Sequence, residues 1–330
     1  MKAFYGFSPN LTPFTGKTPQ EQAALLHSWG ADAVFGGYEN AAFVEAIHAQ
    51  GMQLFAEFPC FVGREWWEQL PESRPITATG QPLAPIDWYH GVNPSVPAVR
   101  QQRLMALSAL LRTYAIDGVW LDFIRWPCRW EKPSPLLQQT SFDLATLARF
   151  SAAIGLNLQT DESAAAAKII LTHYANEWTT WKCEQITDWV AEARQLVDGL
   201  RPGLQLGLFG IPWRQADFAG AIHTIIGQEY AALAPYIDIF SPMTYHHMCG
   251  QPVSWIGDVV QEISHLTNRP VCPIIQAVDQ PTALSPEDYV AGITTAQNAP
   301  GSAGVILFTL AGVLESDKLP ATQQTWQSGR

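Results

Sequence analysis

The feature that most constrains the fold of this chain is an alternation of short apolar runs with helical patterns, repeated eight times along 330 residues. Glycine, proline or polar residues bound each apolar run, as they bound buried strands. The runs are KAFYGFS, ADAVFGG, QLFAEFP, DGVWLDF, LQLGLFGIP, IDIFSPMTY, CPIIQAV and AGVILFTLAG. Eight strands separated by helices indicate parallel βαβ units, and the number eight favours a closed barrel over an open doubly wound sheet.

The helical patterns between the runs support this interpretation. The clearest are PAVRQQRLMALSALLRTYA, ITDWVAEARQLVDGL and VSWIGDVVQEISHL, in which apolar residues recur at spacings of three and four. The sequence contains no GxGxxG after its first strand and no GxxxxGK[ST], so a nucleotide-binding sheet is disfavoured. We predict an α/β fold: one (β/α)8 barrel, a TIM barrel, over residues 1–330.

Composition excludes several classes of protein. Hydrophobic residues make up 47% of the chain and charged residues 15%, which is typical of a folded protein with a large core. A formal net charge of -11 argues against a nucleic-acid partner, because such binding depends on clustered Lys and Arg. The five cysteines, at positions 60, 128, 183, 249 and 272, form no CxxC pair, so neither a disulfide framework nor a zinc ribbon is expected.

The ends and the apolar runs of the chain bear on its location. The first residues, MKAFYGFSPN, enter a strand-like run without the features of a secretory signal, and no apolar run has the length of a membrane span. We therefore expect no membrane partner and a cytoplasmic location for the sequence as it stands, or a secreted one if the chain is a trimmed mature form. The sequence does not indicate an oligomeric state.

Two connections between strands are much longer than the others. They cover about residues 60–93, after the third strand, and about 128–170, after the fourth. In a barrel of this type both lie at the C-terminal face, where active sites are found. We expect their tryptophans to be partly exposed and to line a groove for sugar rings, although some of them are expected simply to anchor the loops. These are Trp66, Trp67, Trp88 and Trp130.

The fourth strand, DGVWLDF, places a carboxyl group at that face. Because side chains alternate along a strand, Trp120 and Asp122 share one side and are expected to face the barrel interior. Asp122 would then lie at the floor of the pocket. The alternative is that it only forms an ion pair with Arg125 or caps a helix. Asp117 begins the strand, at the wrong end for catalysis, and is expected to be structural.

The residues around this strand resemble a known group of proteins. The run NPSVPAVRQQRLMALSALLRTYAIDGVWLDFIRWP resembles the barrel domains of uncharacterised glycoside-hydrolase-like proteins, and WTTWKCEQITDWV, FGIPWR, FSPMTY and IIQAV resemble later segments of the same group in the same order. The resemblance spans about residues 90–280. It implies a (β/α)8 barrel that acts on carbohydrate.

Better known relatives of that group suggest roles for individual residues. The fourth strand is distantly similar to the chitinase motif DGxDxDxE, but Trp120 replaces its second acid and Ile124 replaces its catalytic Glu. It is also similar to the GFRxD strand of α-amylases, which implies that Asp122 is a catalytic nucleophile. SPMTYHH is similar to the chitinase MxYD strand: Met243 and Tyr245 match, while His246 replaces the Asp.

Glycoside hydrolysis normally needs a second carboxyl group. Glu57, at the end of the third strand, is the preferred candidate, with Asp122 expected to be ionised and Glu57 to be the neutral proton donor. Glu57 could instead pair with Arg64 or Arg125 or cap the backbone. Further candidates lie on the loops, and Asp238, early in the sixth strand, is expected to be structural. The loop candidates are Glu131, Asp87 and Asp279.

The remaining candidates would bind substrate. Arg125 would hold Asp122 ionised or bind a sugar hydroxyl or carboxylate. The other expected contacts are Trp120, Tyr245, His247 and Gln276. His246, His247 and Cys249 are not expected to bind a metal, since neighbouring residues of a strand point to opposite faces, and no cofactor is expected.

Two functions therefore remain open. The first is a glycoside hydrolase acting on an oligosaccharide or polysaccharide through Asp122 and Glu57. The second is a catalytically inactive carbohydrate-binding barrel that keeps the aromatic groove. The sugar, the linkage and the stereochemical outcome are not indicated.

Overall fold

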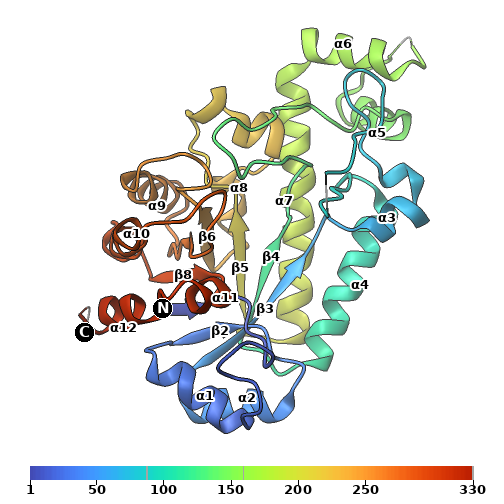
Figure 1. Ribbon diagram of the computed structural model, residues 1–330. Coiled ribbons are helices and arrows are strands. Elements are labelled where there is room, and N and C mark those ends of the chain that lie inside the picture. The colour runs from blue at the N-terminus through green and yellow to red at the C-terminus, as the bar shows by residue number, and fades with distance from the viewer. Residues whose placement is uncertain (87, 159, 329–330) are drawn as a thin grey trace.

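The computed structural model of the chain describes residues 1–86, 88–158 and 160–328. Eight parallel strands pair in chain order, and β1 pairs with β8 to close the barrel (Figure 1). The strands are β1 Lys2–Phe4, β2 Ala33–Phe35, β3 Gln53–Pro59, β4 Gly118–Asp122, β5 Gln205–Gly210, β6 Ile239–Thr244, β7 Ile274–Gln276 and β8 Val305–Phe308. All eight predicted strands and the closed (β/α)8 fold are thus confirmed.

Helices surround the barrel and extend above it. The three helical patterns singled out in the sequence correspond to α4, to the second half of α7 and to α9. The α-helices are α1 Pro19–Ser28, α2 Ala41–Ala49, α3 Arg64–Gln69, α4 Pro97–Thr113, α5 Leu144–Ile154, α6 Ser163–His173, α7 Ala175–Leu200, α8 Tyr230–Leu233, α9 Ser254–Thr267, α10 Pro286–Asn298, α11 Leu310–Glu315 and α12 Leu319–Ser328. Three shorter turns are η1 Pro71–Ser73, η2 Asp217–Ala219 and η3 Ile222–Ile226. Within the described residues, no helix is long and apolar enough to span a membrane.

Aromatic rings fill the barrel interior, and Trp120 is the largest of them. Its indole ring contacts Phe35 and Phe55 at centroid distances of 5.1 and 4.5 Å. Its Nε1 donates a hydrogen bond to Ser241 Oγ at 3.0 Å, which satisfies the one polar group that the ring buries. Gly207 on β5 leaves the space that this ring occupies, because a Cβ there would overlap the indole.

Replacing Gly207 by Ala is expected to lower the free energy of unfolding by about 1–3 kcal/mol, because the added methyl group overpacks a core that is already full. Urea denaturation measures the change. Gly199, in α7, is the matched control, since a Cβ there meets nothing within 4 Å. Gly199→Ala should leave stability unchanged or raise it by up to about 1 kcal/mol, as expected for a helical glycine. Equal effects of the two substitutions would contradict this packing.

The two long connections form a lobe above the C-terminal end of the barrel. In Figure 1, α3, α5, α6 and the first half of α7 lie together beyond the ends of β3 and β4. The connections are joined by a backbone bridge between Thr77 and Thr140 and by the Asn93 amide, which donates to Asp143 at 3.0 Å and to Thr146 at 2.8 Å. The lobe therefore walls one side of the barrel mouth.

Candidate functional site

Two carboxyl groups meet at the mouth of the barrel. Asp122 is the last residue of β4, and Glu57 lies two residues before the end of β3, where its register partner is Trp120. Both side chains are on the interior side, as the alternation in the sequence predicted. The two carboxyl groups are close enough for a side-chain hydrogen bond that contributes to the raised pKa of Asp122.

The surroundings of Asp122 favour its protonated form. Burial, and next the negative charge of Glu57, raise the pKa of Asp122 well above its usual value. The guanidinium of Arg125, with Nη1 at 3.9 Å from Oδ1, and the backbone N–H of Phe123, at 2.6 Å, act in the opposite direction but are outweighed. These surroundings act against the prediction that Asp122 is the ionised member of the pair. Sequence reasoning counted the neighbouring cation and missed the burial.

The contact between the carboxyl groups also limits what the pair can do alone. Carboxyl groups that flank a glycosidic bond are about 5–5.5 Å apart in retaining enzymes and about 6.5–9.5 Å apart in inverting ones. Two groups that share a hydrogen bond are closer than either spacing. Asp122 and Glu57 therefore form a single proton-sharing unit on one side of a bond.

Tyrosines from β1 and β6 complete the surroundings of the pair. The hydroxyl of Tyr5, just after β1, donates a hydrogen bond to Glu57 Oε2. Tyr245 follows β6 and is buried, and burial, then the nearby Tyr5 and Asp122, raise the pKa of its hydroxyl far above the usual value. Phe308 lies between them, with ring centroids 5.2 Å from Tyr5 and 4.9 Å from Tyr245. This row of rings lies beside the carboxyl pair.

Arg125 is buried where the chain leaves β4. Its guanidinium lies over the rings of Phe123 and Tyr89, 4.8 and 5.7 Å from their centroids. Only 3% of the residue is exposed, and its Nε has no hydrogen-bond partner. Burial lowers the pKa of this guanidinium, but the acidic groups of Tyr89, Glu131 and Asp122 together raise it above its usual value. The cation therefore stays charged and holds one unused donor.

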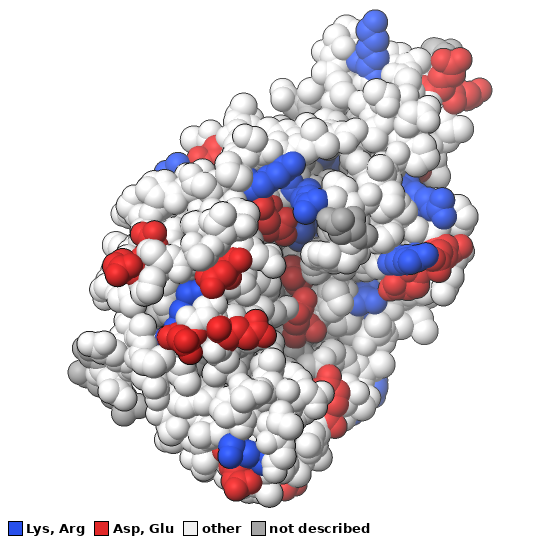
Figure 2. Space-filling view, in the orientation of Figure 1, with Lys and Arg blue, Asp and Glu red and all other residues white. Residues whose placement is uncertain are grey.

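A cavity opens on each side of this centre. The larger, which we call the aromatic cavity, has a volume of about 500 Å³, and the smaller, the acidic cavity, has about 320 Å³. Rings and charged groups lining the aromatic cavity are Trp88, Tyr89, Tyr245, Phe308, Arg125, Arg129, Glu131 and Lys132. The acidic cavity is lined by Tyr5, Tyr38, Glu39 and Glu57 together with backbone of the first two βα loops. The row of rings formed by Tyr5, Phe308 and Tyr245 joins the two cavities. Figure 2 shows basic and acidic side chains close together across the middle of one face.

Three of the four predicted groove tryptophans are buried. Trp66, Trp67 and Trp130 are 6%, 7% and 0% exposed, so the expectation that they are sugar platforms is wrong. Trp67 donates from Nε1 to the carbonyl of Gly91 at 3.0 Å, within its own connection, and Trp130 stacks on Tyr245, which follows β6, at 5.6 Å. Loops of this length need a core of their own, and these rings supply it.

Trp88 is the exception among the four. It is 70% exposed and lines the aromatic cavity, with its ring 5.9 Å from that of Phe123, the residue after Asp122. An exposed, flat indole beside hydrogen-bonding groups suits a sugar ring.

Other predicted contacts have structural roles. Trp120 is enclosed in the barrel, beneath the carboxyl pair, and is fully buried. Gln276 is buried as well: its amide oxygen accepts from Met248 N at 3.0 Å and its amide nitrogen donates to Val278 O at 2.8 Å. Both were expected to bind substrate and neither is accessible.

The two histidines after β6 diverge, as alternation predicted. His247 contacts Thr282 Oγ1 at 3.0 Å, on the loop after β7. His246 points the other way, is buried near Gly292 of α10, and burial lowers its pKa. Among the described residues no cluster of three or more His, Cys, Asp or Glu could hold a metal ion.

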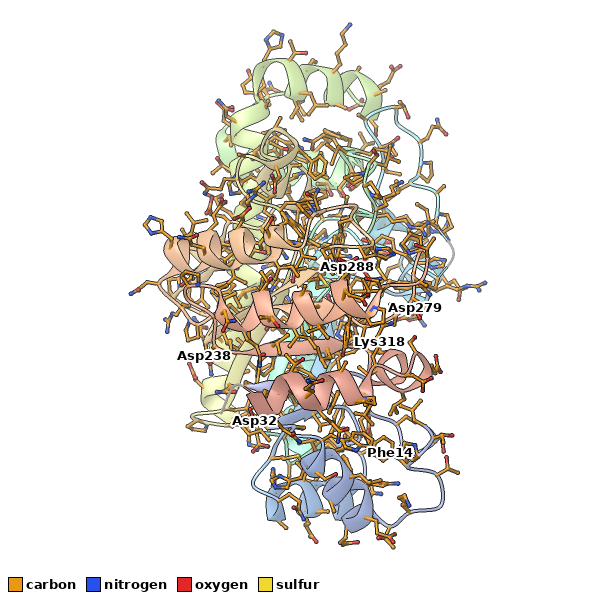
Figure 3. All side chains as sticks on the ribbon, turned by 60° about the vertical axis from the view of Figure 1, so that its left-hand side comes forward. Phe14, Asp32, Asp238, Asp279, Asp288 and Lys318 are labelled. Carbon is orange, nitrogen blue, oxygen red and sulfur yellow. The ribbon has the colours of Figure 1, made fainter. Side chains whose placement is uncertain are left out.

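The remaining acidic candidates differ in place and partners. Asp238 precedes β6 and accepts from Leu206 N at 2.8 Å and from Arg194 at 3.0 Å, which agrees with the structural role expected of it. Arg64, an alternative partner of Glu57, pairs with Glu68 instead. Asp87 lies outside the described residues. Figure 3 shows Asp238 and Asp279 at opposite ends of the barrel.

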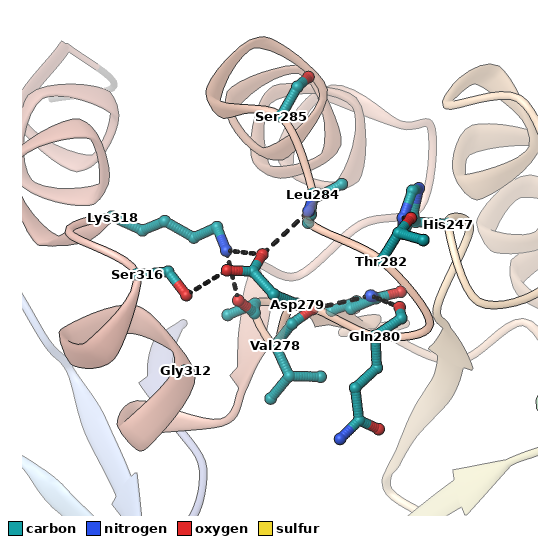
Figure 4. A network of polar contacts seen from close by, with 12 residues as sticks. His247, Val278, Asp279, Gln280, Thr282, Leu284, Ser285, Gly312, Ser316 and Lys318 are labelled. Carbon is teal, nitrogen blue, oxygen red and sulfur yellow. Dashed lines mark hydrogen bonds and ion pairs between the residues drawn. The ribbon is translucent and has the colours of Figure 1, made fainter.

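Asp279, a further predicted candidate, anchors a loop. Its carboxylate accepts from Lys318 Nζ at 2.7 Å, from Ser316 Oγ at 2.5 Å and from Leu284 N at 2.9 Å (Figure 4). These contacts, with the Lys318 hydrogen bond first, lower the pKa of Asp279 to about 2. The loop after β7 is thereby joined to the segment between α11 and α12.

Asp279→Asn should lower the melting temperature at neutral pH, and the difference from wild type should shrink as the pH falls. The sign follows from the lowered pKa, because the ionised contacts stabilise the fold fully above the unfolded-state pKa of about 3.8 and are lost as the pH falls through about 2. Thermal denaturation between about pH 6 and pH 3 measures the trend. A difference that does not depend on pH would show that the contacts of Asp279 do not depend on its charge.

Sequence reasoning missed several residues of the site. Tyr5 follows the first strand and Phe308 ends the last, and the two meet only because the barrel closes. Tyr89 lies in the first long connection and supports Arg125. An aromatic residue at the carboxyl end of a strand is the signal that could have indicated Tyr5 and Phe308.

Comparison with known proteins supports the fold. No family model matches the chain, and no curated protein matches its sequence. Among solved structures, the glycoside hydrolase domain of PgaB (BpsB) from Bordetella bronchiseptica aligns over 98% of both chains, with a TM-score of 0.73 and 13% identity. A β-galactosidase from the psychrophilic Marinomonas ef1 has a TM-score of 0.71 and 10% identity, over 99% of this chain and 59% of that one. Gan42B, a GH42 β-galactosidase from G. stearothermophilus, gives 0.63 and 11%, over 99% and 56%. These neighbours are glycoside hydrolase barrels, and at such identities the likeness is one of fold.

Proposed function

We propose that this protein is a glycoside hydrolase that cleaves an oligosaccharide or polysaccharide lying across the mouth of the barrel. The likeness to glycoside hydrolase barrels supports the class of reaction. The proposal depends most on one observation, the hydrogen-bonded carboxyl pair Asp122 and Glu57 between two cavities at the C-terminal face. Placing two carboxyl groups in contact in a buried site is unfavourable for folding, and such groups are concentrated at sites of catalysis.

In this proposal Asp122 donates the proton to the leaving oxygen. Its raised pKa favours the protonated form, as it does for general acids in glycosidases. When the proton leaves, the charge that develops on Asp122 is met by Phe123 N–H at 2.6 Å and by the guanidinium of Arg125 at 3.9 Å. Glu57, held by the Tyr5 hydroxyl, keeps the carboxyl of Asp122 in place.

The two cavities support a substrate of several sugar units. A chain bound across the carboxyl pair would place one part in the acidic cavity and the other in the aromatic cavity, against Trp88. The test is to measure release of reducing ends from a panel of polysaccharides and chromogenic glycosides, with binding measured in parallel. Cleavage supports the proposal. Binding without cleavage of any substrate would instead favour the carbohydrate-binding barrel.

A further inference from the structure

The hydrogen bond between Asp122 and Glu57 leaves one catalytic role without a residue. Hydrolysis of a glycosidic bond needs a group on each side of it, one to protonate the leaving oxygen and one to activate water or attack the anomeric carbon. Asp122 and Glu57 are in contact and can serve only one side. The other group must come from another part of the cleft.

Glu131 has the position that this role requires. It follows β4 in the long connection and is, among the described residues that line the aromatic cavity, the one with a carboxyl group. Its Oε2 is held by the backbone N–H of Trp130 at 3.3 Å, and Trp130 is fixed by stacking on Tyr245 with 23° between the rings. The backbone of the loop and a buried indole therefore aim this carboxyl at the cavity.

Arg125 and Tyr245 line the aromatic cavity together with Glu131. The guanidinium of Arg125 is 3.9 Å from Asp122, and the negative charge of Glu131 acts on the same guanidinium. Burial, then Tyr5 and the charges of Asp122 and Glu131, raise the pKa of the Tyr245 hydroxyl. Arg125 therefore connects the cavity that Glu131 lines to the proposed proton donor Asp122.

We propose that Glu131 is the catalytic base and that it acts from the aromatic cavity, which it lines together with Arg125. This inference rests on the proposed function. The proton of Asp122 passes to the glycosidic oxygen while the bond from that oxygen to the anomeric carbon breaks and leaves its electron pair on the oxygen. The oxygen of a water molecule bonds to the anomeric carbon, and Glu131 takes the proton that this water loses. Exchange with solvent returns a proton to Asp122 and removes one from Glu131.

The test is chemical rescue on two substrates, an oligosaccharide that wild type cleaves and a dinitrophenyl glycoside of the same sugar, whose leaving group needs no proton. Glu131→Ala should lower kcat/KM by at least about 100-fold on both substrates. Sodium azide should restore turnover of the dinitrophenyl glycoside and yield a glycosyl azide, because the small anion fits where the carboxylate was. Asp122→Asn should lose far more activity on the oligosaccharide than on the dinitrophenyl glycoside.

Matched variants separate this role from a structural one. Glu72 is an exposed glutamate of the same lobe, and Glu72→Ala should retain wild-type activity. Glu39, hydrogen-bonded to Tyr38 in the acidic cavity, is the competing carboxyl, and Glu39→Ala should give no glycosyl azide. If Glu131→Ala keeps more than about a tenth of wild-type activity, or forms no glycosyl azide, Glu131 is not the base. The proposed function still stands in that case if Asp122→Asn is inactive on the oligosaccharide. A wild-type protein that cleaves nothing overturns both.

Discussion

Replacing Asp122 by Asn is expected to lower kcat on an oligosaccharide by about 10²–10⁴-fold, the usual contribution of general acid catalysis. Asparagine keeps the size of the side chain, its amide oxygen still accepts from Phe123 N–H, and its amide nitrogen donates to Glu57. The geometry of the pair should therefore persist without a proton to transfer. Steady-state kinetics on purified variants measures the loss, and calorimetry of sugar binding shows whether the cleft is intact.

Asp117 provides the matched control. It lies just before β4, at the end opposite to Asp122, where it accepts from Leu54 N at 2.7 Å and pairs with His48 at 2.9 Å. Asp117→Asn removes the same charge, so stability should fall while kcat stays close to wild type. If Asp122→Asn retained wild-type turnover, Asp122 would not be the proton donor.

Removing the cation beside Asp122 should have the second largest effect. Arg125→Met keeps the length of a side chain that packs on Phe123 and Tyr89, but it removes a positive charge that holds down the pKa of Asp122. Without it the carboxyl becomes a weaker acid, and charge left on it is no longer stabilised. We expect kcat/KM to fall by about 10²–10³-fold, as when one electrostatic donor of an active site is removed.

The pH profile distinguishes this effect from misfolding. The descending limb of kcat/KM reports the ionisation of the proton donor in the free protein. Because Arg125 lowers the pKa of Asp122, its loss should raise that pKa and move the limb to higher pH. Arg103 is the control: it lies on α4 and stacks on Phe58 and Trp66, outside the cleft. A limb that moves in Arg103→Met, or stays in place in Arg125→Met, would contradict the assigned role of Arg125.

The fold could be predicted because each strand carries its own local signature. Seven residues are enough to predict a strand, its interior face and its carboxyl end in DGVWLDF and in QLFAEFP. The positions of Asp122 and Glu57 therefore followed from the alternation of side chains alone. The contact between them required the register in which Pro59 pairs with Asp122, and no local pattern gives that register.

The charge states and the groove were less predictable. Which member of a carboxyl pair holds the proton depends on burial, and the burial of Asp122 cannot be read from its own segment. The exposure of the tryptophans could not be predicted either. A run such as REWWEQL shows that the rings are present but does not indicate which residues cover them. Trp67 is covered by its own loop, whereas Trp88 is exposed at the cavity.

The most direct test of glycoside hydrolysis at this carboxyl pair is cleavage in water labelled with oxygen-18, followed by mass spectrometry of the products. The substrate is an oligosaccharide or polysaccharide that the protein binds. The wild-type protein should release fragments with one labelled oxygen at each new reducing end, and Asp122→Asn should release almost none under the same conditions. Intact substrate after incubation with the wild-type protein, or equal labelling by wild type and Asp122→Asn, would contradict the account.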